Sequence, residues 1–446
     1  MKFGSSGIRG VVNTEITSES ALCIGRAVGS EYHDVVVGRD PRTSSEMIEC
    51  AVVSGLLSVG CQITRVGMVA TPTLAYAARS HNCGVMITAS HNPPEYAGVK
   101  LFNPDGMAFD SGQQESIEQS LEWSVGGAHS KLTPLSSWDC INPVRTDKNA
   151  VFDHISMILS HTRIENPMSV VVDCGCGAAS MTTPYLLREL GCDVITLNSQ
   201  PDGFFPGRSS EPKEEHLKVL RSVVQEVHAD IGIAHDGDAD RMVAVDDRGR
   251  FVSNDKLLAF FGMREAERSM VVPVDTSMLI DAVLPGVTIT RTRVGDVYVA
   301  EAIKRTLADF GGEASGTWIF PKVSYCPDGI YAAARLIEMI STEEGRFSDH
   351  ISALPTYEIK RGALPMPHRG GAGDGGVMGM IEEELRTVTG FTDINTLDGV
   401  RIALDDAWAL VRPSGTEPLI RITVEGKTKA VVDRLYLHIE KIIKEL

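Results

Sequence analysis

Residues 85–100, "VMITASHNPPEYAGVK", start with the pattern of a buried strand and end in a turn of small residues and prolines. The turn places Ser90 at the end of the strand, followed directly by His91, and Lys100 comes ten residues later. A serine in such a turn can act as a nucleophile and carry a covalently bound group. Neighbouring side chains of an extended segment point to opposite sides, so His91 is predicted to organise the loop by hydrogen bonding rather than to form a Ser-His triad.

Three acidic residues in "HDGDADR", residues 235–241, directly follow the apolar strand pattern "IGIA". Asp236, Asp238 and Asp240 occupy every second position, so their side chains project to one side of an extended segment. There the three carboxylates repel each other unless a cation lies between them. The glycine and glutamate of an EF-hand loop are replaced by Arg241 and Asp247. Oxygen ligands without a nearby histidine pair favour Mg²⁺ over zinc. We therefore predict a Mg²⁺ site, and a solvated acidic turn is the alternative.

Two further stretches gather polar side chains in turns that contain glycine. In "RPSGTEP", residues 412–418, a guanidinium and two hydroxyls around Gly415 form the arrangement expected of a phosphate cradle. An ordinary turn between two strands is the alternative. In "GGEASG", residues 311–316, Glu313 and Ser315 lie in a glycine-rich loop, which a helix end followed by a connection would also explain.

A nucleophilic serine, a metal site and a separate phosphate cradle together describe phosphoryl transfer through a covalent serine intermediate. Without a strong base to activate Ser90 for hydrolysis, we expect a resting phosphoserine whose transferring group is neutralised by Mg²⁺. A metal-dependent phosphatase would share the serine and the metal but would not need a distant cradle. A sugar-phosphate sensor without catalytic activity is the third alternative.

The elements that must position these residues alternate between strand-length apolar runs and helical patterns, which predicts α/β layers. Three similar rounds of about 100 residues suggest three related α/β domains. Beyond Tyr357 the pattern changes to a smaller α+β domain. We expect domains at 1–145, carrying the serine loop; 146–250, carrying the metal loop; 251–357, carrying the glutamate loop; and 358–446, carrying the phosphate cradle.

The composition limits which binding partners and which cellular compartment we expect for the protein. The net charge of −17 disfavours nucleic acid and anionic membranes, although a few placed cations could still bind a small anion. No apolar run approaches a membrane span, and the first residues lack the hydrophobic region of a secretory signal, so we expect a cytoplasmic protein. Nine scattered cysteines fit reduced thiols, mostly in the core, better than a disulfide framework.

The four stretches "TASHNPP", "DGDADR", "GGEASG" and "RPSGTEP", in this order, resemble the four signatures of the α-D-phosphohexomutase superfamily. The resemblance covers essentially the whole chain. It implies four domains around a central cleft, three of them related α/β domains with mixed sheets and the last a smaller α+β domain. It also implies interconversion of hexose 6-phosphate and hexose 1-phosphate through a phosphoserine and a bisphosphorylated sugar. One Mg²⁺ per chain, activation by hexose 1,6-bisphosphate, a small sugar-phosphate substrate and a monomer or homodimer follow from the same resemblance.

The resemblance also assigns roles to individual residues. It implies that Ser90 is the phosphoserine and binds Mg²⁺ together with Asp236, Asp238 and Asp240, with Arg241 in the same loop. Sugar hydroxyls would contact Glu313 and Ser315, and Arg9 would lie near the transferring group. The non-reacting phosphate would be held by Arg412, Ser414, Gly415 and Thr416. Lys100 is either a proton-transfer group, which requires its pKa to be lowered by a positive neighbour such as Arg9, or a phosphate-pairing cation.

Two positions bear on the choice of sugar. Asp296 follows the glycine of "RTRVGDVYV", as in the phosphoglucosamine mutases of the superfamily. Thr317 stands where bacterial phosphoglucosamine mutases commonly have histidine, and "GTWIFP" looks more like archaeal members. Glucosamine phosphate is the leading substrate, and glucose and mannose phosphates are the alternatives.

Overall fold

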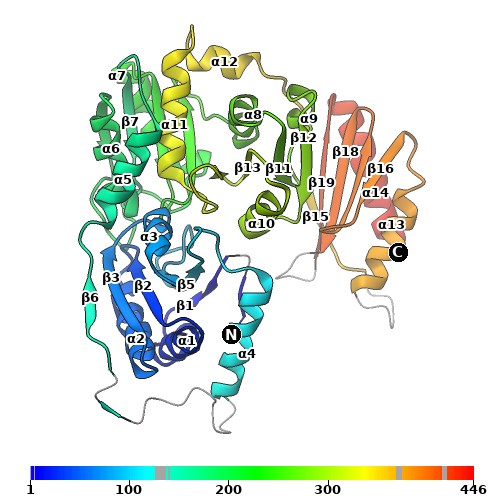
Figure 1. Ribbon diagram of the computed structural model, residues 1–446. Helices are drawn as coiled ribbons and strands as arrows, with labels where there is room; N and C mark the ends of the chain where they lie inside the picture. Colours follow the sequence, from blue (N-terminus) through cyan, green and yellow to red (C-terminus); the bar gives the residue numbers. More distant parts are fainter. Residues whose placement is uncertain (1, 5, 126–136, 139–140, 368–373, 414–418) are drawn as a thin grey trace.

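The computed structural model describes residues 2–4, 6–125, 137–138, 141–367, 374–413 and 419–446, and it contains four separate sheets (Figure 1). We use the predicted bounds 1–145, 146–250, 251–357 and 358–446 as names for domains I to IV, and we count strand 144–146, which crosses the first bound, with domain I because it pairs with that domain's sheet. Each of the first three sheets mixes parallel and antiparallel strands, whereas the sheet of domain IV is antiparallel. The predicted fold class, three α/β domains with mixed sheets and a smaller α+β domain, is confirmed.

Domain I has a six-stranded sheet in the order β1-β5-β4-β2-β3-β6. Its strands are β1 (Ile8–Val11), β2 (Asp34–Arg39), β3 (Gln62–Met68), β4 (Cys83–Ile87), β5 (Tyr96–Phe102) and β6 (Val144–Thr146), and its helices are α1 (Ser18–Glu31), α2 (Ser45–Ser58), α3 (Thr71–Ala77) and α4 (Ser111–Val125). Helices α1 and α2 touch backbone to backbone, because a Cβ atom on Gly25 would lie only 2.2 Å from the carbonyl oxygen of Val52. This close packing covers one face of the sheet with a continuous apolar core.

Domains II and III have four-stranded sheets in the orders β10-β9-β7-β8 and β12-β11-β13-β14. The elements of domain II are α5 (Ala150–His161), β7 (Ser169–Asp173), α6 (Thr183–Glu189), β8 (Asp193–Leu197), α7 (Lys218–Val227), β9 (Ile231–His235) and β10 (Met242–Asp246). Those of domain III are α8 (Asn254–Glu265), β11 (Ser269–Pro273), α9 (Leu279–Val283), β12 (Thr288–Thr292), α10 (Asp296–Thr306), β13 (Phe310–Glu313), β14 (Thr317–Ile319), α11 (Gly329–Thr342) and α12 (Phe347–Ala353). Helix α11 lies between the two sheets (Figure 1) and contributes to one apolar core that the two domains share.

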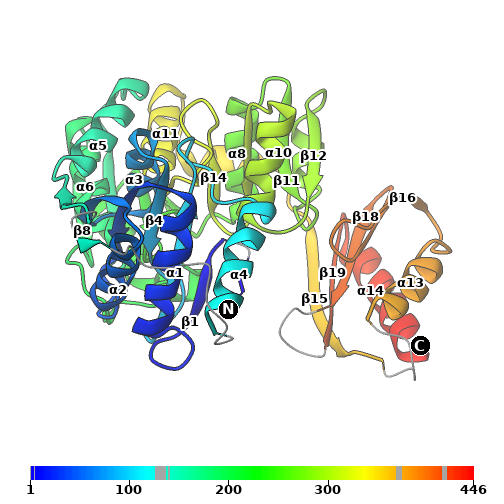
Figure 2. The same ribbon diagram turned by 60° about the horizontal axis from the view of Figure 1, so that its bottom comes forward.

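Domain IV has a five-stranded sheet in the order β15-β19-β18-β17-β16. Its elements are β15 (Glu358–Pro365), α13 (Asp374–Leu385), β16 (Phe391–Asn395), β17 (Val400–Leu404), β18 (Ala407–Pro413), β19 (Leu419–Gly426) and α14 (Lys429–Glu445). Figure 2 shows α13 and α14 on the side of this sheet that faces away from domain III. On the opposite face, Trp408 and Leu410 pack against Val274 of domain III, so domain IV rests on domain III through a small apolar contact.

Three of the four predicted functional stretches follow strands that run parallel to a neighbour in their own sheet, whereas the stretch 412–418 starts at the end of β18, in the antiparallel sheet. Ser90 follows β4, the three aspartates follow β9, and Glu313 ends β13. Loops after the carboxyl ends of parallel strands are the usual place for ligand sites in α/β domains.

Two predictions from composition concern the whole chain. The eight cysteines of the described residues are free thiols, and six of them are buried, as predicted. Among those same residues, no helix has the length and apolar character needed to cross a membrane.

Candidate active site

Ser90 is buried in the loop after β4, with 1% of its surface exposed. Its hydroxyl Oγ donates to Asp236 Oδ2 at 2.9 Å and lies 3.2 Å from His91 Nδ1. The backbone at Ser90 is left-handed, with φ of 51°, and its N–H donates to Thr88 Oγ1. The prediction that Ser90 and His91 point apart is therefore wrong, because it assumed an extended backbone.

His91 is a neutral partner for the serine. Burial, followed by the positive charges of Arg241 and Arg9, lowers the pKa of His91 to about 2. A neutral imidazole can donate a hydrogen bond through one ring nitrogen and accept one through the other. His91 therefore contacts the reactive oxygen as a neutral group, and its role in organising the loop stays a prediction.

Arg42, which the sequence analysis missed, holds the backbone of the serine loop. The side chain is 2% exposed, and its Nε donates to Asp40 Oδ2 at 3.0 Å. Its Nη1 and Nη2 atoms donate to four carbonyl oxygens, those of Ser90, Asn92, Pro93 and Tyr96. The available signal was an Asp-Pro-Arg sequence directly after a buried strand, but nothing in it points to a loop about fifty residues away.

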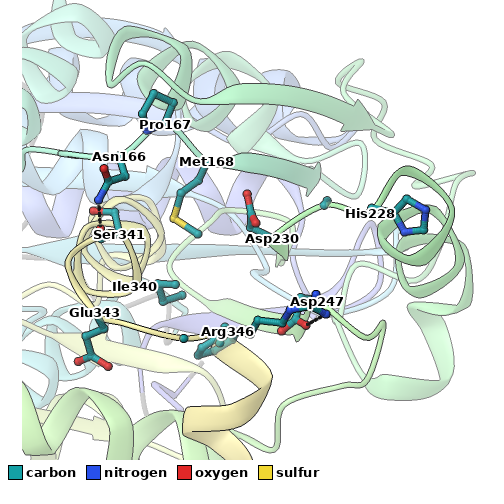
Figure 3. A pocket seen from close by; sticks show the side chains of 13 residues that line it. Asn166, Pro167, Met168, His228, Asp230, Asp247, Ile340, Ser341, Glu343 and Arg346 are labelled. Carbon is teal, nitrogen blue, oxygen red and sulfur yellow. Dashed lines mark hydrogen bonds and ion pairs between the residues drawn. The ribbon is translucent and has the colours of Figure 1, made fainter.

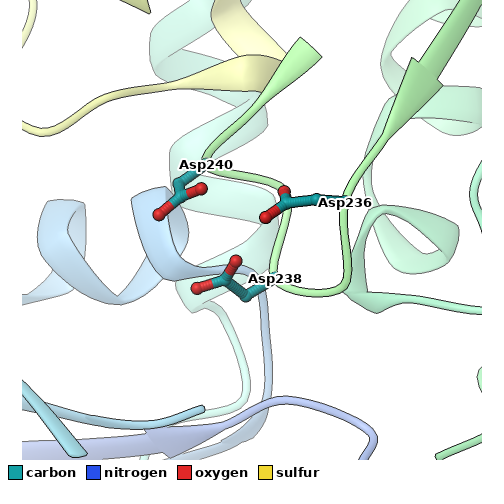
Figure 4. A group of neighbouring side chains, drawn as sticks. All are labelled: Asp236, Asp238 and Asp240. Atoms are coloured by element: carbon teal, nitrogen blue, oxygen red, sulfur yellow. The ribbon is translucent and has the colours of Figure 1, made fainter. Parts of the chain in front are cut away.

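Asp236, Asp238 and Asp240 converge, as Figure 4 shows. All three are buried, and one carboxylate oxygen of each lies within 4.8 Å of the others. The loop is a turn between the antiparallel strands β9 and β10, with Ala239 at φ of 59°. Convergence was correctly predicted, but it arises because the chain reverses and not because the segment is extended.

The cluster fits a divalent cation. The Oδ1 atoms of Asp238 and Asp240 are buried without a hydrogen-bond partner among the described residues. Burial, then repulsion by Asp240 and Asp238, raises the pKa of Asp236. Buried carboxylate oxygens that lack partners are costly unless a cation compensates them, and a set of oxygen ligands is what Mg²⁺ prefers.

Lys100, on β5, is buried against the same cluster. Its Nζ lies 2.8 Å from Asp238 Oδ2 and 2.5 Å from Asp240 Oδ2. Burial alone would lower the pKa of Lys100, but Asp238 and Asp240 outweigh it and raise the pKa. The lowered pKa that the proton-transfer alternative requires is not found in this arrangement, because two carboxylates lie in contact with Lys100 while Arg9 instead donates to Asn92 and Ser6.

A cavity of about 350 Å³ opens beside Ser90 and brings together side chains from all four domains. Predicted residues that line it are Arg9, Ser90, His91, Asp240, Arg241, Asp296, Glu313, Ser315 and Thr317. Asp236, Asp238 and Lys100 lie behind this lining and connect to it through Ser90 and Asp240. The loops of domains II and III are fixed to each other here, since Met242 N donates to Gly316 O at 2.9 Å.

Glu313 is 8% exposed and accepts three hydrogen bonds from its surroundings. The donors are Gly295 N at 2.8 Å, Ser315 Oγ at 3.3 Å and Thr317 Oγ1 at 3.2 Å. Burial, followed by the nearby charge of Asp296, raises the pKa of Glu313 to about 7. Thr317 thus orients the glutamate at the position discussed for substrate choice.

Two further residues of the lining, Asp275 and Arg361, were not singled out from the sequence. Arg361 reaches the cavity from β15 of domain IV. Burial raises the pKa of Asp275 despite the nearby positive charge of Arg412. A lone aspartate or arginine outside a motif carries no sequence signal for a site, so only the fold reveals them.

Arg412 does not line this cavity; its Nη1 contacts Asp398 Oδ2 at 3.1 Å. The other members of the predicted phosphate cradle, Ser414, Gly415 and Thr416, lie outside the described residues.

A second cavity, of about 490 Å³, lies between domain II and the helices α11 and α12 (Figure 3). Its three acidic groups already accept hydrogen bonds from the protein: Asp230 from Ser169 N, Asp247 from Ser348 N and Glu343 from Arg264 Nε. It contains none of the predicted site residues, and we assign no chemistry to it.

Comparison with known proteins agrees with this arrangement. Residues 1–124, 151–249 and 253–357 match the three α/β/α domains of the phosphoglucomutase/phosphomannomutase family, and residues 376–441 match its C-terminal domain. The chain is 52% identical over 442 residues to a protein of Methanocella arvoryzae named probable phosphoglucosamine mutase, covering 99% of this chain and 98% of that protein. It is 54% identical over 446 residues to a protein of the same name from Methanosarcina acetivorans, with 99% of each covered.

A crystal structure of a phosphoglucomutase/phosphomannomutase family protein from Burkholderia thailandensis has a similar fold. The TM-score is 0.85 at 24% sequence identity, with 99% of this chain and 96% of that chain covered. All four domains are matched in order along almost the whole chain. The chain therefore belongs to the phosphoglucomutase/phosphomannomutase family of the α-D-phosphohexomutase superfamily.

Proposed function

We propose that this phosphohexomutase interconverts glucosamine 6-phosphate and glucosamine 1-phosphate through a phosphoserine at Ser90. One observation carries the chemistry: Ser90 Oγ lies 2.9 Å from Asp236 Oδ2, where a buried cluster of three carboxylates meets the cavity. At that position, Ser90 Oγ can carry a phosphoryl group next to a divalent cation.

The reaction would proceed in two transfers. The bond between phosphorus and Ser90 Oγ breaks as a sugar hydroxyl oxygen bonds to phosphorus, and Ser90 Oγ receives the proton that the hydroxyl loses. The bisphosphorylated sugar then presents its other phosphate: the bond between phosphorus and that sugar oxygen breaks as phosphorus bonds to Ser90 Oγ, and the serine proton passes to the sugar oxygen. Neutral His91 has its Nδ1 3.2 Å from Ser90 Oγ; because the single serine proton is donated to Asp236, an Nδ1–H tautomer of His91 can donate to Ser90 Oγ between the two transfers.

The cations around the serine have complementary roles. Arg9 and Arg241 line the cavity and would stabilise the negative charge of the phosphoryl group as it moves. Lys100 contacts Asp238 and Asp240, whose charges raise its pKa, so in this arrangement its ammonium is a cation that can pair with phosphate. Bound Mg²⁺ would supply further charge neutralisation at the transferring oxygens. Its ligands would be Ser90, Asp236, Asp238 and Asp240, the residues whose oxygens converge in the structure.

Domain IV would hold the phosphate that does not react. Arg361 already contributes to the cavity, and Arg412, Ser414, Gly415 and Thr416 would complete the cradle. Each end of the sugar must fit both phosphate sites in turn, so a cradle on a separate domain can close over either orientation and exclude water.

Acidic side chains of the cavity support an amino sugar. Asp275, Asp296 and Glu313 all belong to its lining and come from domain III. Carboxylates near a sugar amine favour its ammonium form electrostatically. The relatives that are 52–54% identical over 99% of the chain carry the name probable phosphoglucosamine mutase, which points to the same substrate.

A substrate panel tests the proposal. The protein would be given the 6-phosphates of glucosamine, glucose, mannose and N-acetylglucosamine with Mg²⁺ and a trace of hexose 1,6-bisphosphate. We expect the highest kcat/KM for glucosamine 6-phosphate. A higher value for glucose or mannose phosphate would reject the amino-sugar assignment. Release of free phosphate in place of a 1-phosphate would instead indicate a phosphatase.

Ser90→Ala tests the covalent step separately. The variant should lose nearly all turnover and also lack the phosphate that intact-mass analysis should detect on part of the wild-type protein. Near-normal rates in this variant would rule out the phosphoserine mechanism.

A further inference from the structure

A third cavity lies between domains III and IV, on the face of the domain IV sheet that is not covered by α13 and α14, and its lining includes Arg291 and Arg401. Its volume is about 620 Å³. One wall comes from α9, the residue before it and β12, and it includes Met278, Asp281 and Arg291. The opposite wall comes from β16, β17 and β18 and includes Arg401 and Trp408.

Arg401 is a buried cation without a bonded counter-ion. It is 9% exposed, its Nε is buried without a partner, and no hydrogen bond or ion pair joins its guanidinium to any other described residue. The guanidinium carbon lies 4.8 Å from the ring centroid of Trp408. The electrons of the ring attract the positive charge, but the ring does not accept a conventional hydrogen bond from the guanidinium. Burying a charged group without hydrogen-bond acceptors costs free energy, so the binding of a ligand that supplies such acceptors would be favoured.

The acidic groups nearby are already engaged or lie in solvent. Glu425 is buried and accepts from Trp408 Nε1 at 2.6 Å and from Met278 N at 2.7 Å, which fixes the tryptophan under Arg401. Asp281 pairs with Arg291, at 2.7 Å between Oδ2 and Nη2. Asp393 and Asp405 also line the cavity, but they are exposed, where water and salt screen their charges.

The second arginine makes the surroundings of Arg401 more positive. Burial, and then the like charge of Arg291, lowers the pKa of Arg401 to about 10. The Nε of Arg291 is also buried without a partner among the described residues. Lys427, which is exposed, adds a third positive charge to the lining.

We infer that this cavity binds a small oxyanion, a phosphate or carboxylate group, between Arg291 of domain III and Arg401 of domain IV. The planar guanidinium offers paired N–H donors that match both kinds of oxyanion. A bound anion would contact both domains, so it would stabilise the arrangement of domain IV against domain III. The site is separate from the catalytic cavity, because the two cavities have no lining residue in common.

Two tryptophans allow a change at the inferred site to be separated from a change elsewhere. In protein labelled with 5-fluorotryptophan, Trp408 lines the inferred site and reports on it, whereas Trp318 is buried in the core, outside the lining of either cavity, and serves as the internal reference. Their ¹⁹F resonances are assigned with Trp408→Phe and Trp318→Phe. The protein is titrated with inorganic phosphate or acetate, with sodium chloride at matched ionic strength as the control. We expect a saturable shift of the Trp408 resonance with at least one oxyanion and none with chloride. The more effective anion would identify the class of ligand.

Arg401→Met removes the charge but keeps an unbranched side chain over Trp408. It should weaken the response of Trp408 about tenfold or more, the loss expected for a charged hydrogen bond, and leave the response of Trp318 unchanged. Arg401→Lys keeps the positive charge but loses the paired N–H donors of the planar guanidinium, so it should give an intermediate affinity. Arg434→Met, which removes an exposed positive charge from α14 of the same domain, is the matched control and should change neither response.

Two results would overturn the inference. The first is a Trp408 resonance that moves no further with phosphate or acetate than with chloride. The second is an undiminished Trp408 response in both Arg401 variants, which would assign the shift to anion binding elsewhere in the protein.

Discussion

Arg42→Lys tests whether one buried guanidinium fixes the position of the reactive serine. The four hydrogen bonds from Arg42 to loop carbonyls and its contact with Asp40 require all three guanidinium nitrogens. A lysine ammonium has three N–H donors, and if one remains with Asp40, at least two carbonyl bonds are lost. At about 1.5 kcal/mol for each hydrogen bond to a charged group, the loop should lose about 3 kcal/mol of local stability.

Hydrogen exchange measures this loss at the loop itself. A change of about 3 kcal/mol corresponds to amide exchange about 100-fold faster in the segment from Thr88 to Tyr96. Turnover should also fall, because a displacement of about 1 Å at the reacting oxygen can reduce the rate about 100-fold. We therefore expect both effects together in the variant, with a lower kcat.

Arg39→Lys is the matched control. Arg39 pairs with Glu49 at 3.0 Å, and Glu49 keeps its second partner, Arg65, in the variant. Arg39 donates no hydrogen bond to the serine loop among the described residues, so neither exchange in that loop nor kcat should change. Unchanged loop exchange and unchanged kcat in Arg42→Lys would refute the reasoning and show that Ser210, which donates to His91 O and Asn92 O, suffices to hold the loop.

The remaining predictions concern the metal, a pH effect and the distal phosphate. Asp238→Asn should keep a melting temperature close to that of the wild type but weaken Mg²⁺ binding in calorimetry and lower kcat by orders of magnitude, because one charged ligand is lost; full activity in excess chelator would contradict the metal assignment. Because burial raises the pKa of Glu313 from 4.5 to about 7, folding stability should fall as the pH rises through this interval, by up to about 3 kcal/mol. Glu313→Gln should remove this fall in urea denaturation, and a variant profile parallel to that of the wild type would show that another group causes it. Arg412→Lys should raise KM and lower kcat, with a loss of about 1.5–3 kcal/mol in kcat/KM, because the charge remains but the planar fork is lost; unchanged kcat/KM with a large drop in melting temperature would assign Arg412 to folding.

The sequence by itself determined the fold class, and it singled out Ser90 and the three aspartates. Alternating apolar strands and helices predict α/β layers from local pattern alone, and four short stretches identify the family because each keeps its chemistry within a few neighbouring residues. Asp236, Asp238 and Asp240 are close in sequence, so any compact loop brings them together.

Only the tertiary structure decided how distant residues meet and which charges they carry. Lys100 and Asp238 are far apart in sequence, and their contact at 2.8 Å raises the lysine's pKa, opposite to the shift that a proton-transfer role would require. The same limit explains why Arg42 and Arg361 were missed: their roles depend on a loop or a domain that packing places beside them. Even for the neighbours Ser90 and His91, the outcome depended on one left-handed backbone angle, which residue type alone does not specify. Hydrophobic pattern and turn residues are local properties of the chain, whereas electrostatic environment and burial are set by the sum of contacts across the folded molecule.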